Sequence, residues 1–172
     1  FPLFLLSQAP DTSKLSSKDN LISIKLYNES LGLFNEQKQP EAITMLNKAI
    51  GLNPDFVKAY YNRGCYRLQS KAFDDAIQDF TQMIRIDPGS KGYMGRGYTY
   101  LMKKEYQKAI EDLSVAVLND PGNAMAYYYR GCGYAQLEKY NPAMADLDKA
   151  IEMKVDYAIA YCDRGIIKLR MK

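Results

Sequence analysis

Large apolar residues along the chain recur in pairs four positions apart, with polar residues between them. This spacing places both members of a pair on one face of an α-helix. The pairs are Leu46 and Ile50, Phe80 and Ile84, Leu113 and Val117, and Leu147 and Ile151. An alanine precedes each pair by one turn, and these alanines, Ala42, Ala76, Ala109 and Ala143, are separated by 34, 33 and 34 residues. The pattern therefore predicts one helical unit that the chain repeats.

A second predicted helix comes before each of these, and small residues mark it at the same period. They are Ser30, Gly64, Gly97, Gly131 and Gly165, and a Leu or Tyr lies one turn earlier at Leu26, Tyr60, Tyr93, Tyr127 and Tyr161. The alanine-bearing helices are expected to end at Asn53-Pro54, Asp87-Pro88 and Asp120-Pro121, because the residue before proline avoids the helical region. Each unit is predicted to be a helical hairpin, closely packed at its small residues.

These residues resemble the tetratricopeptide repeat (TPR) pattern, in which an aromatic residue, Gly, Tyr, Ala, Phe or Leu, Ala and Pro are spread over 34 residues. The copies span residues 23–56, 57–89, 90–123 and 124–157, followed by a fifth first helix. The resemblance implies an all-α fold of tandem hairpins stacked as a right-handed superhelix, an α-solenoid. We expect an N-terminal extension over 1–17, four hairpins over 18–157 and a C-terminal capping helix over 158–172.

The chain departs from the family pattern at a few positions. Ser30 replaces Gly, Met83 a small residue, Arg67 and Lys168 a Tyr, and Val155 the Pro. The second copy is one residue short, and the deletion is expected between Pro88 and Gly97. Gly95 and Gly97 are similar to a fragment of a phosphate loop, but no predicted strand precedes them, so we expect helix packing there.

Charged residues also recur in step. Arg63, Arg96, Arg130 and Arg164 each precede the small glycine, and Asp79, Asp112 and Asp146 recur on the second helices. The first copy lacks both, since it has Glu29 and Met45. Because the Arg and the Asp occur in the same copies and are missing from the same copy, we infer that they contact each other. We therefore predict a semi-buried ion pair at each joint between hairpins. The alternative is an arginine ladder that binds an anionic partner.

Composition limits the chemistry of the chain. It contains no His, which removes the usual general base and the common metal ligand, and it shows no Walker, CxxC or HExxH pattern. We therefore predict a protein that is not an enzyme and that needs no cofactor and no metal. The net charge of +3 comes from interleaved charges, so nucleic acid is not a predicted partner. Three cysteines on predicted helices indicate a reducing compartment, and no apolar run is long enough to span a membrane.

The remaining class of function is binding of another protein. In the family, certain positions of each first helix line a concave groove where peptides lie. The matching residues here, predicted as a peptide-binding groove, are Tyr27, Leu31, Tyr61, Cys65, Met94, Tyr98, Tyr128 and Cys132, with Phe34, Leu68, Gln69, Leu101, Met102 and Gln136 at two further positions. The groove should be apolar and rich in Tyr, a residue suited to binding surfaces. Alternatively, apolar residues at helical spacing are core.

Family members that bind chaperone tails carry a carboxylate clamp of Lys, Asn and Arg residues. Here Asn62 matches one clamp position, but Tyr27, Leu31 and Gly95 occupy others, so no chaperone carboxylate-clamp tail is predicted as a partner. Two alternatives remain open. One alternative to the peptide-binding scaffold is a TPR segment of a larger enzyme or complex subunit, and the other is an RNA-binding helical repeat.

The first residues, Phe1 to Leu6, form a short apolar run. Three interpretations remain: a signal-peptide remnant over residues 1–9, a linker without a role, or an extended tail that docks on the apolar groove of its own or a second molecule and supports self-association. The cysteines predict a cytoplasmic protein, and a signal remnant would instead predict an exported one.

Overall fold

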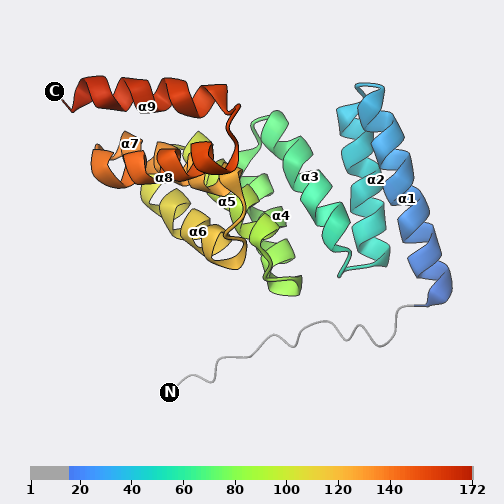
Figure 1. Ribbon diagram of the computed structural model, residues 1–172. Helices are drawn as coiled ribbons and strands as arrows, with labels where there is room; N and C mark the ends of the chain where they lie inside the picture. The colour runs from blue at the N-terminus through green and yellow to red at the C-terminus, as the bar shows by residue number, and fades with distance from the viewer. Residues whose placement is uncertain (1–15, 172) are drawn as a thin grey trace, which may run out of the picture. The chain divides into compact units, whose positions relative to one another are not determined.

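The computed structural model describes residues 16–171, and every regular element in that range is an α-helix (Figure 1). The helices are α1 (Ser17–Asn35), α2 (Gln39–Leu52), α3 (Val57–Gln69), α4 (Phe73–Ile86), α5 (Ser90–Met102), α6 (Tyr106–Asn119), α7 (Ala124–Gln136), α8 (Tyr140–Met153) and α9 (Ala158–Arg170). The predicted all-α fold of tandem helical hairpins is thereby confirmed. The expectations for the tail concern residues 1–15, which lie outside the described residues.

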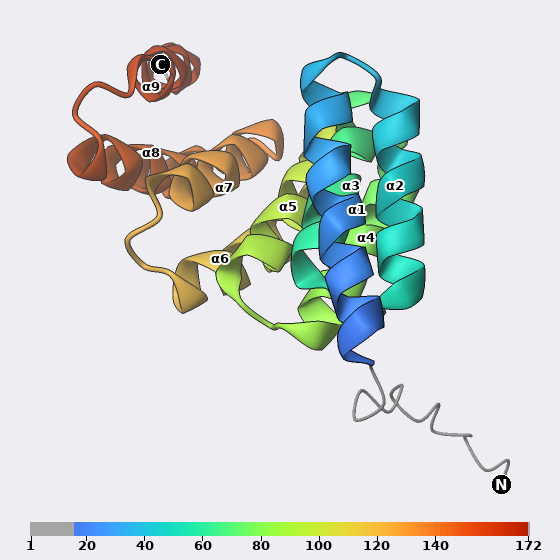
Figure 2. The same cartoon turned by 90° about the vertical axis from the view of Figure 1, so that its right-hand side faces the viewer.

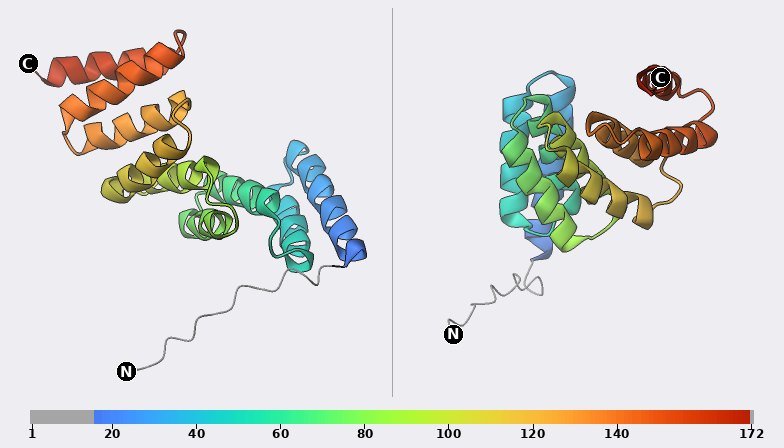
Figure 3. Two further views of the ribbon diagram at one scale, coloured as in Figure 1. Left: turned by 60° about the horizontal axis from the view of Figure 1, so that its bottom comes forward. Right: turned by 90° about the vertical axis from the view of Figure 1, so that its left-hand side faces the viewer.

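The chain divides into two compact units, and α3 contributes to both. Unit 1 ends at Arg63 and holds α1, α2 and the first half of α3, while unit 2 begins at Gly64. In unit 2, consecutive helices from α4 to α9 pack against one another, and α7 also contacts both α5 and α9. The first helices α5, α7 and α9 are therefore neighbours in unit 2, and Figures 2 and 3 show α7, α8 and α9 following one another in chain order.

Local residues explain where the helices begin and end. Ser16 caps α1, since its hydroxyl accepts from the backbone N–H of Asp19 at 3.0 Å. The second helices α2, α4 and α6 end just before the prolines, with C-cap residues Asn53, Asp87 and Asp120, and the backbone of Asn53 and Asp87 is extended. The connection between α4 and α5 comprises residues 87–89, whereas the corresponding later connections comprise residues 120–123 and 154–157. The one-residue deletion therefore lies in the α4–α5 connection, inside the predicted range.

Each turn inside a hairpin places a residue other than glycine in the left-handed region. These residues are Gln37, Lys71, Lys104 and Glu138, with φ of 62°, 61°, 63° and 57°. At the last turn, Lys139 N–H donates to the carbonyl of Tyr134 at 2.9 Å and Glu138 N–H donates to that of Ala135 at 3.0 Å. This is the hydrogen-bonding pattern that closes a helix on a left-handed residue. None of these turns has a glycine at its left-handed position, so no glycine marks them in the sequence.

Replacing Glu138 with glycine should raise the free energy of unfolding by about 0.5–1 kcal/mol. A left-handed backbone costs a residue with a Cβ about 1–2 kcal/mol, part of which the extra freedom of glycine in the unfolded chain offsets. Urea denaturation measures the change. The control is Lys139→Gly, because Lys139 has a φ of −82° and gains nothing from glycine there. Equal effects of the two substitutions would contradict this account.

Unit 1 shows how the first hairpin tolerates serine in place of glycine. Ser30 is fully buried, and its hydroxyl turns back to donate to the carbonyl of Tyr27 in its own helix at 2.6 Å. The hydroxyl is thus satisfied without a partner from α2. Ala42, Leu46 and Ala49 of α2 are fully buried, as the apolar pattern predicted.

Glycines position the core of unit 2. A Cβ on Gly95 would lie 2.6 Å from the ring of Phe80, and one on Gly64 would lie 3.0 Å from the same ring. Phe80 is 1% exposed, and both glycines leave room for its ring. Gly97 is likewise covered by Leu113, whose Cγ would lie 2.8 Å from an added Cβ. Gly95 and Gly97 are therefore packing positions within α5, as expected.

The recurrent arginines and aspartates do form ion pairs, but their predicted location was wrong. Arg96 on α5 donates from Nε and Nη2 to the two carboxylate oxygens of Asp112 on α6, at 2.7 and 2.8 Å. Arg130 on α7 pairs with Asp146 on α8 in the same way, at 2.8 and 2.7 Å. Each bidentate pair joins the two helices of one hairpin, not two hairpins, because both partners belong to the same repeat.

The third guanidinium nitrogen makes the contact between hairpins. In each case Nη1 reaches a polar side chain on the second helix of the preceding hairpin. The pairs are Arg63 with Asn47 at 2.7 Å, Arg96 with Thr81 at 3.0 Å, Arg130 with Ser114 at 3.3 Å and Arg164 with Asp148 at 2.6 Å. Asp79 is paired with Arg67 at 2.7 Å, so the arginine that departs from the family pattern has a partner in the core.

Candidate functional site

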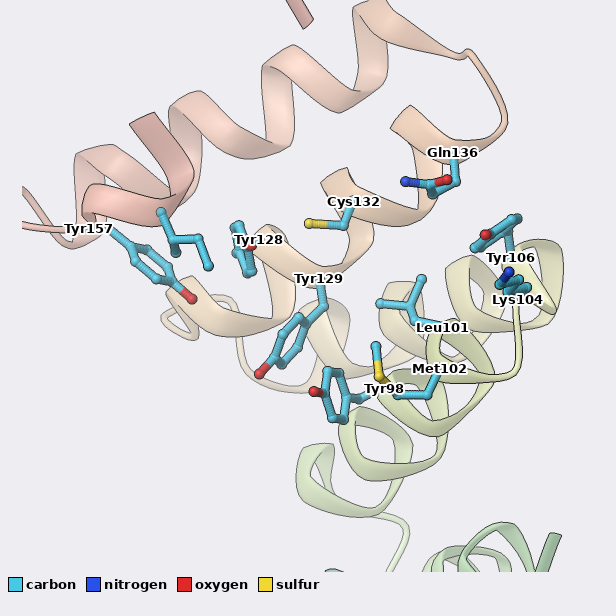
Figure 4. A pocket seen from close by; sticks show the side chains of 11 residues that line it. Tyr98, Leu101, Met102, Lys104, Tyr106, Tyr128, Tyr129, Cys132, Gln136 and Tyr157 are labelled. Carbon is cyan, nitrogen blue, oxygen red and sulfur yellow. The ribbon is translucent and has the colours of Figure 1, made fainter. Parts of the chain in front are cut away.

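Unit 2 contains a hollow of about 560 Å³ bounded by α5, the α5–α6 turn, α7 and the start of α9 (Figure 4). We call it the tyrosine groove. Its lining residues are Tyr98, Leu101, Met102, Lys104, Tyr106, Tyr128, Tyr129, Cys132, Gln136, Tyr157 and Ile159. Most of them come from first helices, which are neighbours in the unit. The repeat thus brings equivalent faces of neighbouring hairpins to a common surface.

Aromatic rings contact one another along the groove. The rings of Tyr98 on α5 and Tyr129 on α7 lie 4.6 Å apart between centroids. Tyr129 contacts Tyr128 at 5.5 Å, and Tyr128 contacts Tyr157, the N-cap residue of α9, at 5.1 Å. All three pairs are tilted, and their centroid separations lie within the range of about 4.5–7 Å that is typical of interacting aromatic pairs. The groove therefore has a connected aromatic wall (Figure 4).

A partly buried polar cluster contacts one end of this wall. The hydroxyl of Tyr128 donates to Oδ2 of Asp163 on α9 at 2.8 Å, and Sγ of Cys132 lies 3.9 Å from the same oxygen. Burial, with smaller contributions from Cys132 and Asp163, raises the pKa of Tyr128. Burial also raises the pKa of the Cys132 thiol to about 11. At neutral pH both groups are therefore protonated, and the thiol behaves as a small apolar side chain.

Charge is sparse in the groove. Lys104 is the one lining residue with a formal charge at neutral pH. The site thus offers aromatic and aliphatic surface with phenolic hydroxyls and the Gln136 amide as polar groups. Such a surface suits an apolar side chain of a partner, whereas an anionic ligand would meet a single cation.

The structure brings three of the eight predicted groove residues together. Tyr98, Tyr128 and Cys132 line the hollow, although Tyr128 is only 8% exposed and serves the core as well. Met94 packs against the core cluster that contains Leu101. It thus has the core role that was the alternative for apolar residues at helical spacing. Cys65 is half-buried near the start of unit 2.

The other three predicted groove residues, Tyr27, Leu31 and Tyr61, belong to unit 1. The ring of Tyr27 lies 5.1 Å from that of Phe56, and its hydroxyl accepts from Asn62 Nδ2 at 3.1 Å. Asn62, the residue that matches a clamp position, therefore already has a tyrosine partner within unit 1.

Sequence reasoning missed several lining residues. Tyr129 and Tyr157 contribute rings, and Ile159 an aliphatic side chain that is 52% exposed. Tyr129 follows Tyr128 directly in the sequence, in a run of three tyrosines. Because successive residues of a helix point in different directions, this run could have indicated that tyrosines of one helix contact more than one neighbouring helix. Lys104 comes from the turn between α5 and α6, where helical periodicity carries no information, and Tyr106 is the first residue of the second helix α6, whereas the prediction considered first helices.

The fold is that of a tandem helical repeat. Family models agree: one described as TPR repeat matches residues 33–69, and one described as tetratricopeptide repeat matches residues 57–90 and 124–156. Together these segments cover more than half of the chain. The chain belongs to the tetratricopeptide repeat family.

A curated protein is similar to a short segment of the chain. Hsp70-Hsp90 organizing protein 3 of Arabidopsis thaliana is 39% identical over 57 residues, which represent 33% of this chain and 10% of that protein. The match therefore spans about a tenth of the relative's length. Among the described residues, no helix is both long and apolar enough to cross a membrane.

Solved structures share the fold at low sequence identity. The MamA protein from residue 41 to its end, from Desulfovibrio magneticus RS-1, aligns over 91% of this chain and 87% of its own, with a TM-score of 0.81 and 20% identity. The first TPR of Spaghetti (RPAP3), bound to the HSP90 peptide SRMEEVD, aligns over 67% of this chain and 92% of its own, with a TM-score of 0.66 and 22% identity.

Proposed function

We propose that the protein is a non-enzymatic scaffold that binds an apolar peptide or helix of a partner protein in the tyrosine groove. The observation that carries the proposal is the connected wall of Tyr98, Tyr129, Tyr128 and Tyr157 beside a hollow of about 560 Å³ with one charged lining residue. Tyrosines supply a broad apolar face with little side-chain entropy to lose and one polar group.

The expected ligand differs from that of the neighbour solved with an HSP90 peptide. The peptide SRMEEVD carries several carboxylates, and these need cationic partners in a binding site. Lys104 is the single cation among the lining residues. We therefore expect the groove to select side chains such as Leu, Phe or Met, with backbone groups of the ligand meeting the tyrosine hydroxyls.

A charge placed in the groove should weaken binding. Peptides selected from a random linear library on the intact chain serve as probes, with SRMEEVD as the acidic comparison. Met102 is 45% exposed and lines the groove, so Met102→Glu should keep the fold and lower affinity for the selected peptides about tenfold or more, because a buried carboxylate without a partner is costly. Fluorescence anisotropy gives the affinities.

The matched control is Leu118→Glu on α6, because Leu118 is 77% exposed and does not line the groove. It should leave affinity unchanged. Equal loss in both variants, or tighter binding of SRMEEVD than of the selected peptides, would overturn the proposal. Binding of poly-nucleotides that weakens with salt would favour the RNA-binding alternative.

A further inference from the structure

We propose that the partner segment carries one acidic side chain, Asp or Glu, directly beside its apolar residues, and that Lys104 binds this carboxylate at one end of the tyrosine groove. This selectivity rests on the function proposed above, since the groove must first bind a peptide. It differs from recognition of the acidic peptide SRMEEVD, because a single carboxylate of the ligand is matched with the single cation of the groove.

The two ends of the groove differ in chemistry. Lys104 lies in the turn after α5, Tyr106 begins α6 and Gln136 ends α7, so these polar groups lie where the first helices α5 and α7 finish. Tyr128 and Tyr157 lie near the starts of α7 and α9. Figure 4 shows Gln136, Tyr106 and Lys104 on one side of the hollow and Tyr157 on the other. The groove therefore has a polar end and an aromatic end.

Within residues 16–171, Lys104 is the one lysine of segment 103–108 that has no ion-pair partner. Lys103 pairs with Asp74 at 2.6 Å and with Glu105 at 2.9 Å. Lys108 also pairs with Glu105, at 2.6 Å. The acidic neighbour of Lys104 in the sequence is thus shared between two other lysines. One positive charge remains at the polar end of the groove, where a carboxylate of the ligand complements it.

Two neighbouring groups are suited to the same carboxylate. The amide of Gln136 and the hydroxyl of Tyr106 can each donate a hydrogen bond, and in the described part of the chain neither side chain has a hydrogen-bond partner. Lys104 and Gln136 are exposed, so a bound peptide can continue past this end of the groove. The open end therefore favours the carboxylate of a side chain over that of a chain terminus.

The expected role of Lys104 is selection of the ligand more than overall affinity. Lys104 is exposed, and exposed ion pairs are weak and are screened by salt. The aromatic wall supplies most of the affinity, whereas the charge distinguishes an acidic neighbour of the apolar residues from a neutral or basic one. We therefore expect an acidic side chain to raise the affinity about three- to fivefold at low salt.

Peptides selected on the intact chain, with acetyl and amide caps that remove the terminal charges, serve as probes. Each peptide is made with Glu or with its isostere Gln, directly before or directly after the apolar residues, and fluorescence anisotropy gives the affinities. At one of these two positions, Glu should bind about three- to fivefold more tightly than Gln at low salt. Sodium chloride at about 0.5 M should remove most of this difference.

The chain provides matched variants for Lys104. The same left-handed turn position is held by Gln37, Lys71 and Glu138 in the other hairpins. Lys104→Gln and Lys104→Glu therefore introduce residues that this backbone already accepts. The first should abolish the preference for Glu, and the second should transfer the preference to a peptide with Lys at that position. Lys71→Gln is the control and should keep the preference for Glu, because Lys71 is exposed, has a φ of 61° and does not line the groove.

Equal affinities of the Glu and Gln peptides at both positions would overturn this inference, as would a similar loss of preference in Lys71→Gln and Lys104→Gln. An equal gain from a free C-terminus on the Gln peptide would also overturn it, because the recognised group would then be the chain end. In these cases the peptides still bind, so the tyrosine groove remains the proposed site. Failure of all the peptides to bind would contradict the proposed function, and this inference with it.

Discussion

Replacing Asp112 with alanine is expected to lower the free energy of unfolding by about 2–3 kcal/mol. The substitution removes both acceptors of the Arg96 fork, whose bonds to Asp112 are 2.7 and 2.8 Å long. The side chains of Arg96 and Asp112 are only 20% and 10% exposed. Without Asp112, little water can therefore reach the guanidinium of Arg96 to replace the lost hydrogen bonds. Breaking a fully buried pair costs about 3–5 kcal/mol, and the remaining exposure reduces that figure.

The control for this prediction is Glu152→Ala. Glu152 pairs with Lys149 at 2.8 Å, but the two side chains are 70% and 44% exposed. Exposed pairs contribute about 0–1 kcal/mol, so this variant should unfold close to the parent in urea. Similar losses in the two variants would show that burial does not set the strength of the repeated arginine pairs.

The same substitution, glycine to alanine, should have opposite effects at Gly95 and Gly165. At Gly95 the new Cβ would lie 2.6 Å from the ring of Phe80, a side chain that is 1% exposed. Overpacking of this kind costs about 1–3 kcal/mol, against a gain of up to about 1 kcal/mol from the higher helix propensity of alanine. We expect a net loss of about 1–2 kcal/mol.

At Gly165 the added Cβ meets open space, so only the propensity gain remains. Gly165→Ala should therefore raise the free energy of unfolding by about 0.5–1 kcal/mol. Urea denaturation of both variants gives the comparison. Stabilisation by Gly95→Ala would mean that Phe80 has room to move, and destabilisation by Gly165→Ala would mean that the space beside Gly165 is not open.

The hairpins could be predicted from sequence because each depends on short-range patterns. Leu113 and Val117 define an apolar face, Pro121 ends a helix, and a small residue such as Gly97 marks close approach of two helices. These signals recur at one period, so each copy supports the interpretation of the others. The pattern did not reveal the left-handed turns, because Lys104 and Glu138 are not residues that ordinarily mark that conformation.

The candidate site was predictable only in part. Tyr98 and Cys132 follow from their repeat positions, but Tyr157 and Lys104 lie outside the first helices. Their place in the groove depends on how the connections between helices run, which helical periodicity does not encode. The ion pairs were misplaced for a related reason: the pattern showed that Arg and Asp vary together without showing which helices they join.

The most direct test of the proposed binding role is a titration of the intact chain, carrying ¹³C-labelled tyrosine rings, with a peptide selected on it. We expect the ring signals of Tyr98, Tyr129 and Tyr157, which line the groove, to shift together and to reach a plateau as the peptide concentration rises. The signal of Tyr161, which does not line it, should stay unchanged. Saturating shifts that leave Tyr98 and Tyr129 unaffected would contradict the claim that the tyrosine groove is the peptide site.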